Sequence, residues 1–203
     1  MSIVKEGYPF ILGSFVVGLI FSFIGFHFFA VICYLLTAFC LFFFRDPDIT
    51  VTQGDNLILS PCNGKVLEVV ENENGRTTIR VFLSVFDVHL QRSPVAGTVK
   101  NVEHKPGKFL KAHDPQAHIV NEHILITIEN ENGIYIVKQI AGILARRCVS
   151  WVKPGDVLKA GDKIGVIKFS SQVDLFMPAG YDIKVKAGDK VVSGITVFAS
   201  ISK

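Results

Sequence analysis

The sequence predicts a mainly β fold, α+β overall, with an N-terminal hydrophobic helical membrane anchor. Two observations lead to this prediction: an uncharged apolar stretch covers residues 10–44, and short strand-like segments follow it to the C-terminus. Because the two parts differ in charge and in periodicity, we divide the chain where one gives way to the other. Residues 1–48 are expected to form the anchor and residues 49–203 a β-rich domain.

The apolar stretch is too long for one membrane-spanning helix. At about 1.5 Å per residue, a single helix of that length reaches about 50 Å, whereas the hydrocarbon core of a bilayer is about 30 Å thick. Gly25 interrupts the stretch near its middle, so we expect two short or tilted helices that form a hairpin. A cleaved signal peptide fits less well, because the apolar run is too long and no small-x-small site ends it. A buried segment of a soluble protein is the other alternative.

Charge and cysteine usage narrow the class of protein. A net charge of +3 over 203 residues offers no strongly basic surface, so we expect no nucleic-acid partner. Cys33 and Cys40 fall in the apolar stretch, which leaves Cys62 and Cys148 in the β-rich part without a C-x-x-C spacing. We therefore expect neither zinc nor a disulfide framework. The domain is expected to face the cytoplasm from the cell membrane.

Strand-and-turn patterns fill the part that follows the anchor. Short runs of β-branched and aromatic residues, separated by Gly, Pro, Asn or Asp, are typical of strands and turns. The expected strands are residues 65–70, 77–83, 124–128, 135–140 and 164–169. Few windows sustain a helical period, but residues 86–92 fit a helical turn.

Two motifs each recur 33 residues further along the chain. The pattern S-P-x-x-G-x-V occupies residues 60–66 and 93–99, and K-x-G-D occupies residues 153–156 and 186–189, followed by Gly161 and Gly194. Each Gly-Asp is typical of a tight turn in which glycine supplies a positive φ. Such paired turns resemble those of barrel-sandwich folds of the biotinyl and lipoyl type, although no hairpin with a modifiable lysine accompanies them. We expect a barrel-sandwich-like architecture.

A pair of hydroxyls, Ser170 and Ser171, lies between two apolar runs near the C-terminus. Such a pair is usually solvated or bonded to the backbone. A serine becomes a nucleophile when a base accepts its proton, and histidine has the pKa nearest to that task. His89 is the candidate base, with a buried histidine satisfied by backbone as the structural alternative.

Two other clusters of polar residues invite a functional interpretation. Four histidines are closely spaced, but no carboxylate or cysteine pattern completes a metal site with them, so we expect no metal: His104, His113, His118 and His123. Arg146 and Arg147 follow a glycine turn and could hold a phosphate or a carboxylate. A solvated charge pair is the alternative for these arginines.

One series of motifs runs in order through nearly the whole chain. It comprises E-G-Y at 6–8, F-F-R-D-P at 43–47, S-P-x-x-G-K-V at 60–66, F-D-V-H at 86–89, P-G-K-F at 106–109, N-E at 121–122, Q-I-A-G and A-R-R within 139–147, and F-x-S-x-V-D at 169–174. In this order the motifs resemble the short bacterial type of phosphatidylserine decarboxylase, a pyruvoyl-dependent membrane enzyme.

The resemblance implies a lyase that is made as a zymogen and cleaves itself between Ser170 and Ser171. Ser171 would become a covalent pyruvoyl group, which forms a Schiff base with phosphatidylserine and yields phosphatidylethanolamine in phospholipid biosynthesis. The upstream β chain, residues 1–170, and the α chain, residues 171–203, would remain together as a heterodimer. His89 matches the family's base, and we expect Arg146 and Arg147 to bind substrate.

Two positions depart from the family's pattern. Glycine usually precedes the cleaved serine, where this chain has Ser170, so we expect slower cleavage; the spacing to Val173 and Asp174 favours Ser171 over Ser170 as the nucleophile. Asn63 stands where the family has an aspartate that orients the histidine. An amide can hydrogen-bond an imidazole but does not stabilise an imidazolium as a carboxylate does.

The departure at Asn63 leaves three interpretations open. Asp87, Asp114 or Glu122 could take the place of the missing carboxylate in an active phosphatidylserine decarboxylase. A second interpretation is an unprocessed, inactive homologue that binds anionic phospholipid without turnover. A third is a purely structural β module tethered to the membrane.

Overall fold

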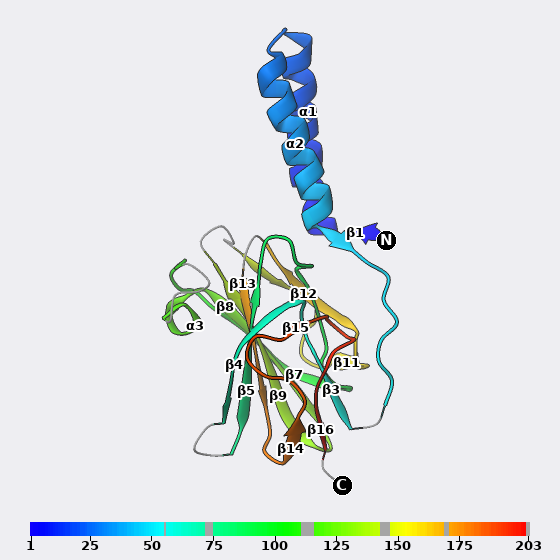
Figure 1. Ribbon diagram of the computed structural model, residues 1–203, viewed down its shortest axis with the longest axis vertical. Helices are drawn as coiled ribbons and strands as arrows, with labels where there is room; N and C mark the ends of the chain where they lie inside the picture. The colour runs from blue at the N-terminus through cyan, green and yellow to red at the C-terminus, as the bar shows by residue number, and fades with distance from the viewer. Residues whose placement is uncertain (55, 72–74, 111–115, 143–146, 169–170, 202–203) are drawn as a thin grey trace. The chain divides into compact units, whose positions relative to one another are not determined.

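The computed structural model describes residues 1–54, 56–71, 75–110, 116–142, 147–168 and 171–201 (Figure 1). They form two compact units, Met1–Asp48 and Ile49–Lys203. The first unit is built on two apolar helices and the second on strands. A mainly β fold with N-terminal apolar helices is thereby confirmed.

The first unit is a helical hairpin closed at its base by a pair of short strands. Its elements are β1 (Ser2–Ile3), the 3-10 helix η1 (Lys5–Gly7), α1 (Tyr8–Phe23), α2 (His27–Phe43) and β2 (Arg45–Asp46). Strand β1 pairs antiparallel with β2. Gly25 lies between the two helices with φ of 84°, a left-handed conformation that glycine adopts without strain. The predicted break at Gly25 is confirmed.

Small and polar side chains hold the two helices together. Ser14 Oγ lies 2.8 Å from Thr37 Oγ1, and Ser22 Oγ lies 3.1 Å from the Tyr34 hydroxyl. Gly18 faces the same ring, so closely that a Cβ at position 18 would lie 2.8 Å from it. The other faces of both helices expose large apolar side chains. The helical stretch Lys5–Phe23 has a mean hydropathy of 1.5 and, by length and composition, is sufficient to cross a membrane.

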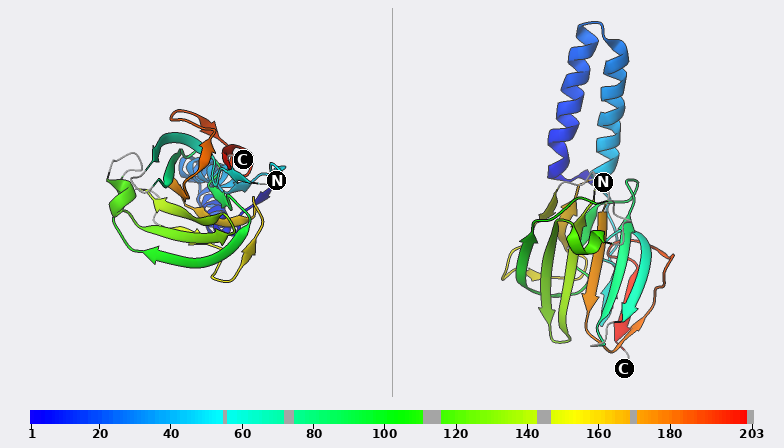
Figure 2. Two further views of the ribbon diagram at one scale, coloured as in Figure 1. Left: turned by 90° about the horizontal axis from the view of Figure 1, so that it is seen from below. Right: turned by 90° about the vertical axis from the view of Figure 1, so that its left-hand side faces the viewer.

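The second unit is a strongly curled antiparallel sheet with two smaller sheets (Figures 1 and 2). The eight-stranded sheet has the order β11-β7-β8-β9-β13-β5-β4-β15, and the three-stranded sheets have the orders β10-β12-β6 and β14-β16-β3. The bounds are β3 (Leu57–Leu59), β4 (Gly64–Glu71), β5 (Thr77–Leu83), β6 (Leu90–Arg92), β7 (Gly97–Lys105), α3 (Ala117–Val120), β8 (His123–Asn130), β9 (Gly133–Ala141), β10 (Cys148–Ser150), β11 (Val157–Leu158), β12 (Lys163–Ile167), β13 (Ser171–Met177), β14 (Tyr181–Ile183), β15 (Lys190–Val191) and β16 (Val197–Ile201).

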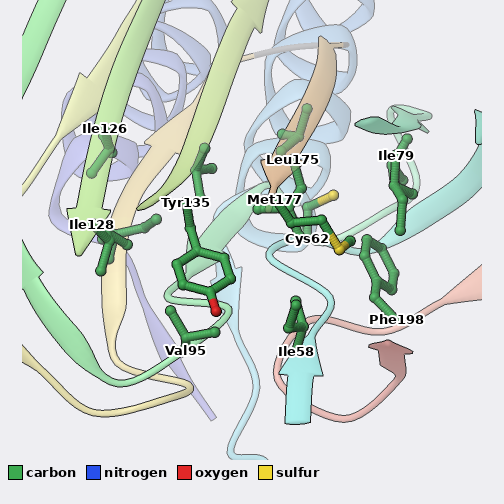
Figure 3. Close-up of a cluster of buried hydrophobic side chains, with 14 of the residues drawn as sticks. Ile58, Cys62, Ile79, Val95, Ile126, Ile128, Tyr135, Leu175, Met177 and Phe198 are labelled. Atoms are coloured by element: carbon green, nitrogen blue, oxygen red, sulfur yellow. The ribbon is translucent and has the colours of Figure 1, made fainter. Parts of the chain in front are cut away.

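The core lies on the inner face of the curled sheet. Alternate residues of its strands point inward, as the period of two requires, and Figure 3 shows Ile126, Tyr135, Leu175 and Met177 meeting there. Ile58 of β3 belongs to the same buried cluster. The outer face of the sheet therefore carries the remaining residues of each strand, among them Asp174 of β13.

The two sequence repeats correspond to two copies of one structural device. Ser60 Oγ donates to Cys62 O and Ser93 Oγ donates to Val95 O, each at 2.7 Å. The S-P-x-x-G segment at residues 60–64 leads into β4, which pairs with β15, the strand that follows the K-x-G-D turn at residues 186–189. The segment at residues 93–97 leads into β7, which pairs with β11, the strand that follows the turn at residues 153–156. The recurrence in the sequence therefore corresponds to an internal pseudo-symmetry of the second unit.

Most expected strands are present, and one expected element is wrong. The predicted strands at residues 65–70, 77–83, 124–128 and 135–140 correspond to β4, β5, β8 and β9; that at 164–169 corresponds to β12, with its last residue outside the described part. Residues 86–92 do not form a helical turn. Phe86 and Asp87 end a tight turn that begins at Ser84, and β6 follows, because pairing of Leu90 with Val166 of β12 prevails over the local pattern.

We predict that Gly64→Ala lowers the free energy of unfolding by about 3 kcal/mol. Gly64 has φ of 151°, and a Cβ there would lie 2.2 Å from the carbonyl oxygen of Phe82. Gly180→Ala is the matched control, because Gly180 also has a positive φ, 86°, but no atom would lie within 4 Å of its Cβ. We expect about 1 kcal/mol for the control. Equal losses in denaturant unfolding would contradict the close approach at Gly64.

Candidate active site

Three strand ends meet at Ser171. It is the first residue of β13, and its backbone lies opposite Leu83, the last residue of β5, on one side and Ala141, the last residue of β9, on the other. The loops that leave β5 and β9 therefore start beside Ser171. Ser170 lies outside the described residues, so the expected cleavage site is located from Ser171 and the strand that follows it.

The loop that carries His89 is held at both of its ends. The loop that carries it leaves β5 at Leu83 and is closed by Asp87, whose Oδ2 accepts hydrogen bonds from the backbone and the hydroxyl of Ser84 at 2.8 and 2.7 Å. At the other end of the loop, the carbonyl oxygen of His89 accepts the Ile167 N–H at 3.1 Å. Ile167 lies just upstream of the expected cleavage site, so the backbone of His89 is tied to the segment that leads into that site.

The hydrogen bond of His89 selects its tautomer. The side chain is buried, and Nδ1 lies 3.0 Å from the carbonyl oxygen of Asp87. A carbonyl oxygen can only accept, so Nδ1 carries the proton and Nε2 is left as the basic nitrogen. This is the form in which a histidine acts as a general base through Nε2.

A second loop is tied to the same sheet edge by Asn121. Its Oδ1 accepts the Leu110 N–H at 2.8 Å, and its Nδ2 donates to the carbonyl oxygens of Leu110 at 2.9 Å and Ala141 at 2.8 Å. The Ala141 N–H donates to the carbonyl oxygen of Glu122 at 2.9 Å. A Cβ at Gly107 would lie 2.4 Å from the carbonyl oxygen of Val120. The P-G-K-F and N-E motifs thus hold this loop beside Ala141, the residue of β9 that lies opposite Ser171.

Of the two arginines that we expect to bind substrate, the structure describes Arg147. Arg147 is exposed, and its carbonyl oxygen accepts the Lys168 N–H at 3.3 Å, so its backbone lies next to the segment that leads to the expected cleavage site. Arg146 lies outside the described residues. An exposed guanidinium at this position can reach an anionic ligand without a large desolvation cost.

Asn63 lies in the turn before β4. Its Oδ1 accepts the Ser193 N–H at 3.1 Å. The preceding residue, Cys62, is fully buried, and burial raises the pKa of its thiol well above the usual range, with the charges of Asp87 and Asp174 adding to the effect. Cys62 is therefore a neutral thiol rather than a nucleophile. The structure thus bonds Asn63 to Ser193, while the His89 ring nitrogen Nδ1 is bonded to the carbonyl oxygen of Asp87.

Asp174 is a buried carboxylate on the outer face of β13. It is 1% exposed; Gln172 Nε2 donates to its Oδ1 at 2.6 Å, and Arg80 Nε lies 3.6 Å from its Oδ2. Burial raises the pKa of Asp174 to about 6, against the hydrogen bond from Gln172 and the charges of Arg80 and Lys138. Lys138 stands opposite Asp174 in the sheet and donates to the carbonyl oxygen of His118 at 2.5 Å.

The clustered histidines have separate partners. His104 Nε2 lies 3.3 Å from a carboxylate oxygen of Glu122, while His123 Nδ1 donates to the carbonyl oxygen of Asn121 at 2.7 Å. The carbonyl of His118 accepts the Lys138 bond, and His113 lies outside the described residues. Within the described part of the chain, no three His, Cys, Asp or Glu side chains are grouped as a metal site would require.

Sequence reasoning missed the role of several buried polar residues. Asn121 and Gln139 were recognised as parts of motifs without a structural role, and Gln91 was not singled out at all. Gln91 and Gln139 are both fully buried and hydrogen-bonded to each other at 2.8 Å. The available signal was a glutamine at an inward position of an apolar strand, where an amide needs a partner.

Comparison with known proteins gives a consistent result over almost the full length. A family model described as phosphatidylserine decarboxylase matches residues 36–199. The phosphatidylserine decarboxylase proenzyme of Wolbachia pipientis wMel is 40% identical over 210 residues, which cover 98% of this chain and 91% of the relative. The proenzyme of the same description from Anaplasma phagocytophilum (strain HZ) is 41% identical over 209 residues, covering 97% and 90%.

The raised pKa of Asp174 predicts a specific pH dependence of stability. The fold favours the protonated carboxyl, so the native state binds more protons than the unfolded chain between about pH 4 and pH 6. The free energy of unfolding should therefore fall by about 2–3 kcal/mol as pH rises through this window. His123, whose pKa is lowered by burial, acts in the opposite direction, so the contribution must be isolated by subtraction.

The Asp174→Asn variant isolates the contribution of Asp174 to the pH dependence of stability. In a Ser171→Ala background, which keeps one chain, the pH profile of the variant subtracted from that of the parent should give the falling step alone. Asp182→Asn, at an exposed carboxylate, is the control and should leave the profile unchanged. If the free energy of unfolding of Asp174→Asn falls with pH as much as that of the parent, the step belongs to another group. The readout is the denaturant midpoint followed by tryptophan fluorescence at pH 4 to 7.

Proposed function

This chain belongs to the phosphatidylserine decarboxylase family and decarboxylates phosphatidylserine, and we propose that it makes its own catalytic group by cleaving the backbone between Ser170 and Ser171. The observation that supports this most strongly is the register of β13, which begins at Ser171 between the ends of β5 and β9. The product would be phosphatidylethanolamine, made for phospholipid biosynthesis.

The proposed cleavage uses residues that surround this strand end. Ser171 Oγ attacks the carbonyl carbon of residue 170, the peptide C–N bond breaks, and an ester takes its place. His89 Nε2 then removes the α-proton of residue 171, and the electron pair forms a C=C bond while the upstream chain leaves as a carboxylate. Water hydrolyses the remaining enamine, ammonia leaves, and a ketone stands at the new N-terminus.

The residues at this site fit such a group. The new terminus stays in place because its backbone is paired with strands on both sides. A pyruvoyl carbonyl at this terminus would supply an electron sink for the loss of carbon dioxide from an amine-bearing substrate. His89, held as the Nδ1–H tautomer, is suited to return a proton to the substrate carbon once it has itself been protonated.

We propose that the two chains remain a heterodimer after cleavage. The α chain, residues 171–203, contributes β13, β14, β15 and β16. Strand β13 pairs with β5 and β9, β15 pairs with β4, and β16 pairs with β3, all of them in the upstream β chain. Separating the chains would expose every one of these ladders.

Substrate is proposed to reach the site from the membrane surface. Phe86, 69% exposed, lies in the His89 loop, and Phe109, 37% exposed, lies in the loop that Asn121 holds. Lys108, which precedes Phe109, and Arg147 are exposed, and their positive charges suit an anionic headgroup. The apolar hairpin would insert in the cytoplasmic membrane, and we propose that the catalytic unit faces the cytoplasm. Arg146 is proposed to bind the headgroup together with Arg147.

We predict that Ser171→Ala leaves a single chain of 22.4 kDa without decarboxylase activity, because the attacking hydroxyl is lost. Ser170→Ala is the matched control and should still cleave, since only the acyl side of the bond changes. A denaturing gel over time and carbon dioxide release from phosphatidylserine vesicles provide the readouts. A Ser170→Ala variant that stays intact, beside a Ser171→Ala variant that cleaves, would move the site by one residue. A wild type that stays one intact chain and shows no turnover would instead leave a lipid-binding homologue.

Asn63 takes the place of the family's aspartate, and we propose that position 63 influences His89 through its charge and not through a bond to the ring, because Asn63 Oδ1 accepts the Ser193 N–H and His89 Nδ1 donates to the Asp87 carbonyl. Asn63→Asp should then speed self-cleavage by about tenfold or more, because a carboxylate stabilises the imidazolium that forms as the proton is taken. Asn101→Asp, at an exposed position of β7, controls for added charge. Unchanged or slower cleavage would show that the Asp87 carbonyl alone orients the ring.

A further inference from the structure

Two buried glutamines form a chain of hydrogen bonds that ends on the main chain of His89. Gln91 Nε2 donates to the carbonyl oxygen of His89 at 2.7 Å, and Gln139 Nε2 donates to Gln91 Oε1 at 2.8 Å. Gln91 and Gln139 have no exposed surface, and His89 is 1% exposed. The His89 carbonyl also accepts the Ile167 N–H, so both of its lone pairs are engaged.

The direction of this chain is fixed by chemistry. A carbonyl oxygen only accepts, so Gln91 must turn its amide nitrogen toward His89 and its oxygen away. That oxygen can then be satisfied only by a donor, which requires Gln139 to present its own nitrogen. The remaining oxygen, Gln139 Oε1, is buried and makes no hydrogen bond with any described residue. Each link therefore depends on the one before it.

The chain of hydrogen bonds links β6 to β9 across β12. Gln91 lies on β6, and Gln139 lies on β9 opposite Val173, two residues from Ser171. Between them runs β12, where Gly165 is paired with Gln91. A Cβ at position 165 would lie 2.7 Å from Gln139 Nε2 and 2.3 Å from the carbonyl oxygen of Val149. A glycine at this point is what allows the two amides to meet.

A purely structural core would be served better by apolar side chains at these positions. Burying an amide costs free energy unless it is bonded, and a chain of buried hydrogen bonds favours one arrangement of the backbone to which it is attached. Here the arrangement that it fixes is that of the residue proposed as the base. The ring of His89 is held at Nδ1 by the Asp87 carbonyl, and its backbone is held by Gln91 and Ile167.

We propose that Gln91 and Gln139 are positioning residues, which set the place of the His89 imidazole relative to residue 171 for self-cleavage and for turnover. This inference rests on the proposed function. Without Gln91, the His89 carbonyl loses one of its two donors, and the loop between β5 and β6 gains freedom at the residue where precision matters most. A misplacement of about 1 Å in a reacting group costs on the order of 100-fold in rate.

Gln91→Leu tests the proposal, since leucine has a similar size and no donor. We expect its rate constant for self-cleavage to fall about 10- to 100-fold. The matured fraction should show a lower kcat for phosphatidylserine with an unchanged KM, because the headgroup contacts are elsewhere. Ser93→Ala is the control: it deletes another buried bond just after β6, from the Ser93 hydroxyl to Val95, and should cleave within about twofold of wild type. Unfolding midpoints of both, in a Ser171→Ala background, show whether the stability losses are comparable.

Gln139→Glu gives a second readout that a merely structural role would not produce. A glutamate side chain can donate to Gln91 only when protonated, and burial raises its pKa toward neutrality. The ratio of variant to wild-type cleavage rates, measured on folded precursor, should therefore fall as pH rises from about 5 to 8. This variant decides the question if Gln91→Leu does not fold.

The outcomes separate this proposal from the one on which it rests. A wild type that never cleaves overturns the proposed self-cleavage and this inference with it. A cleaving wild type beside a Gln91→Leu variant as fast as Ser93→Ala overturns the inference alone, as does a pH-independent rate ratio for Gln139→Glu. Slow cleavage by Gln91→Leu at a stability equal to that of Ser93→Ala supports it.

Discussion

The backbone pairing of β13 is the constraint on which the rest of the site depends. This strand is bonded to β5 on one side and β9 on the other, with Ser171 opposite the final residue of each. In an antiparallel sheet a slip of one residue would turn every side chain of β13 to the other face. The buried inward positions at Val173, Leu175 and Met177 therefore fix where the strand begins, and with it which serine stands at the meeting point of three strand ends.

The other features of the site follow from that register. The loop after β5 carries His89 back to β12, and the loop held by Asn121 is joined to the end of β9. A backbone carbonyl, that of Asp87, gives His89 the tautomer that a carboxylate gives in the serine-protease arrangement, which is how an asparagine at position 63 can be compatible with general-base chemistry. Because residues 171–201 form strands that pair with upstream strands, the same register would also keep the two chains associated after the proposed cleavage.

Sequence reasoning succeeded where a local pattern determines the structure. Gly25 could be recognised as the helix break because a long apolar run needs one, and the strands of the large sheet show their alternation plainly. Residues 86–92 were misjudged because a short helical pattern was outweighed by pairing with β12, which no local window contains. Gln91 was missed, and Gln139 was left without a role, because their partners come from different strands. The repeats were recognised, but the pairing of each S-P-x-x-G strand with the K-x-G-D turn of the other repeat is a three-dimensional fact.

The most direct test of this account is the mass of the purified wild-type protein, measured first under native and then under denaturing conditions. The account predicts one complex that separates, on denaturation, into residues 1–170 and a fragment 171–203 whose N-terminus is blocked to sequencing and reacts with carbonyl reagents. A single chain of 22.4 kDa under both conditions, or a fragment that begins with a free serine amine, would contradict it.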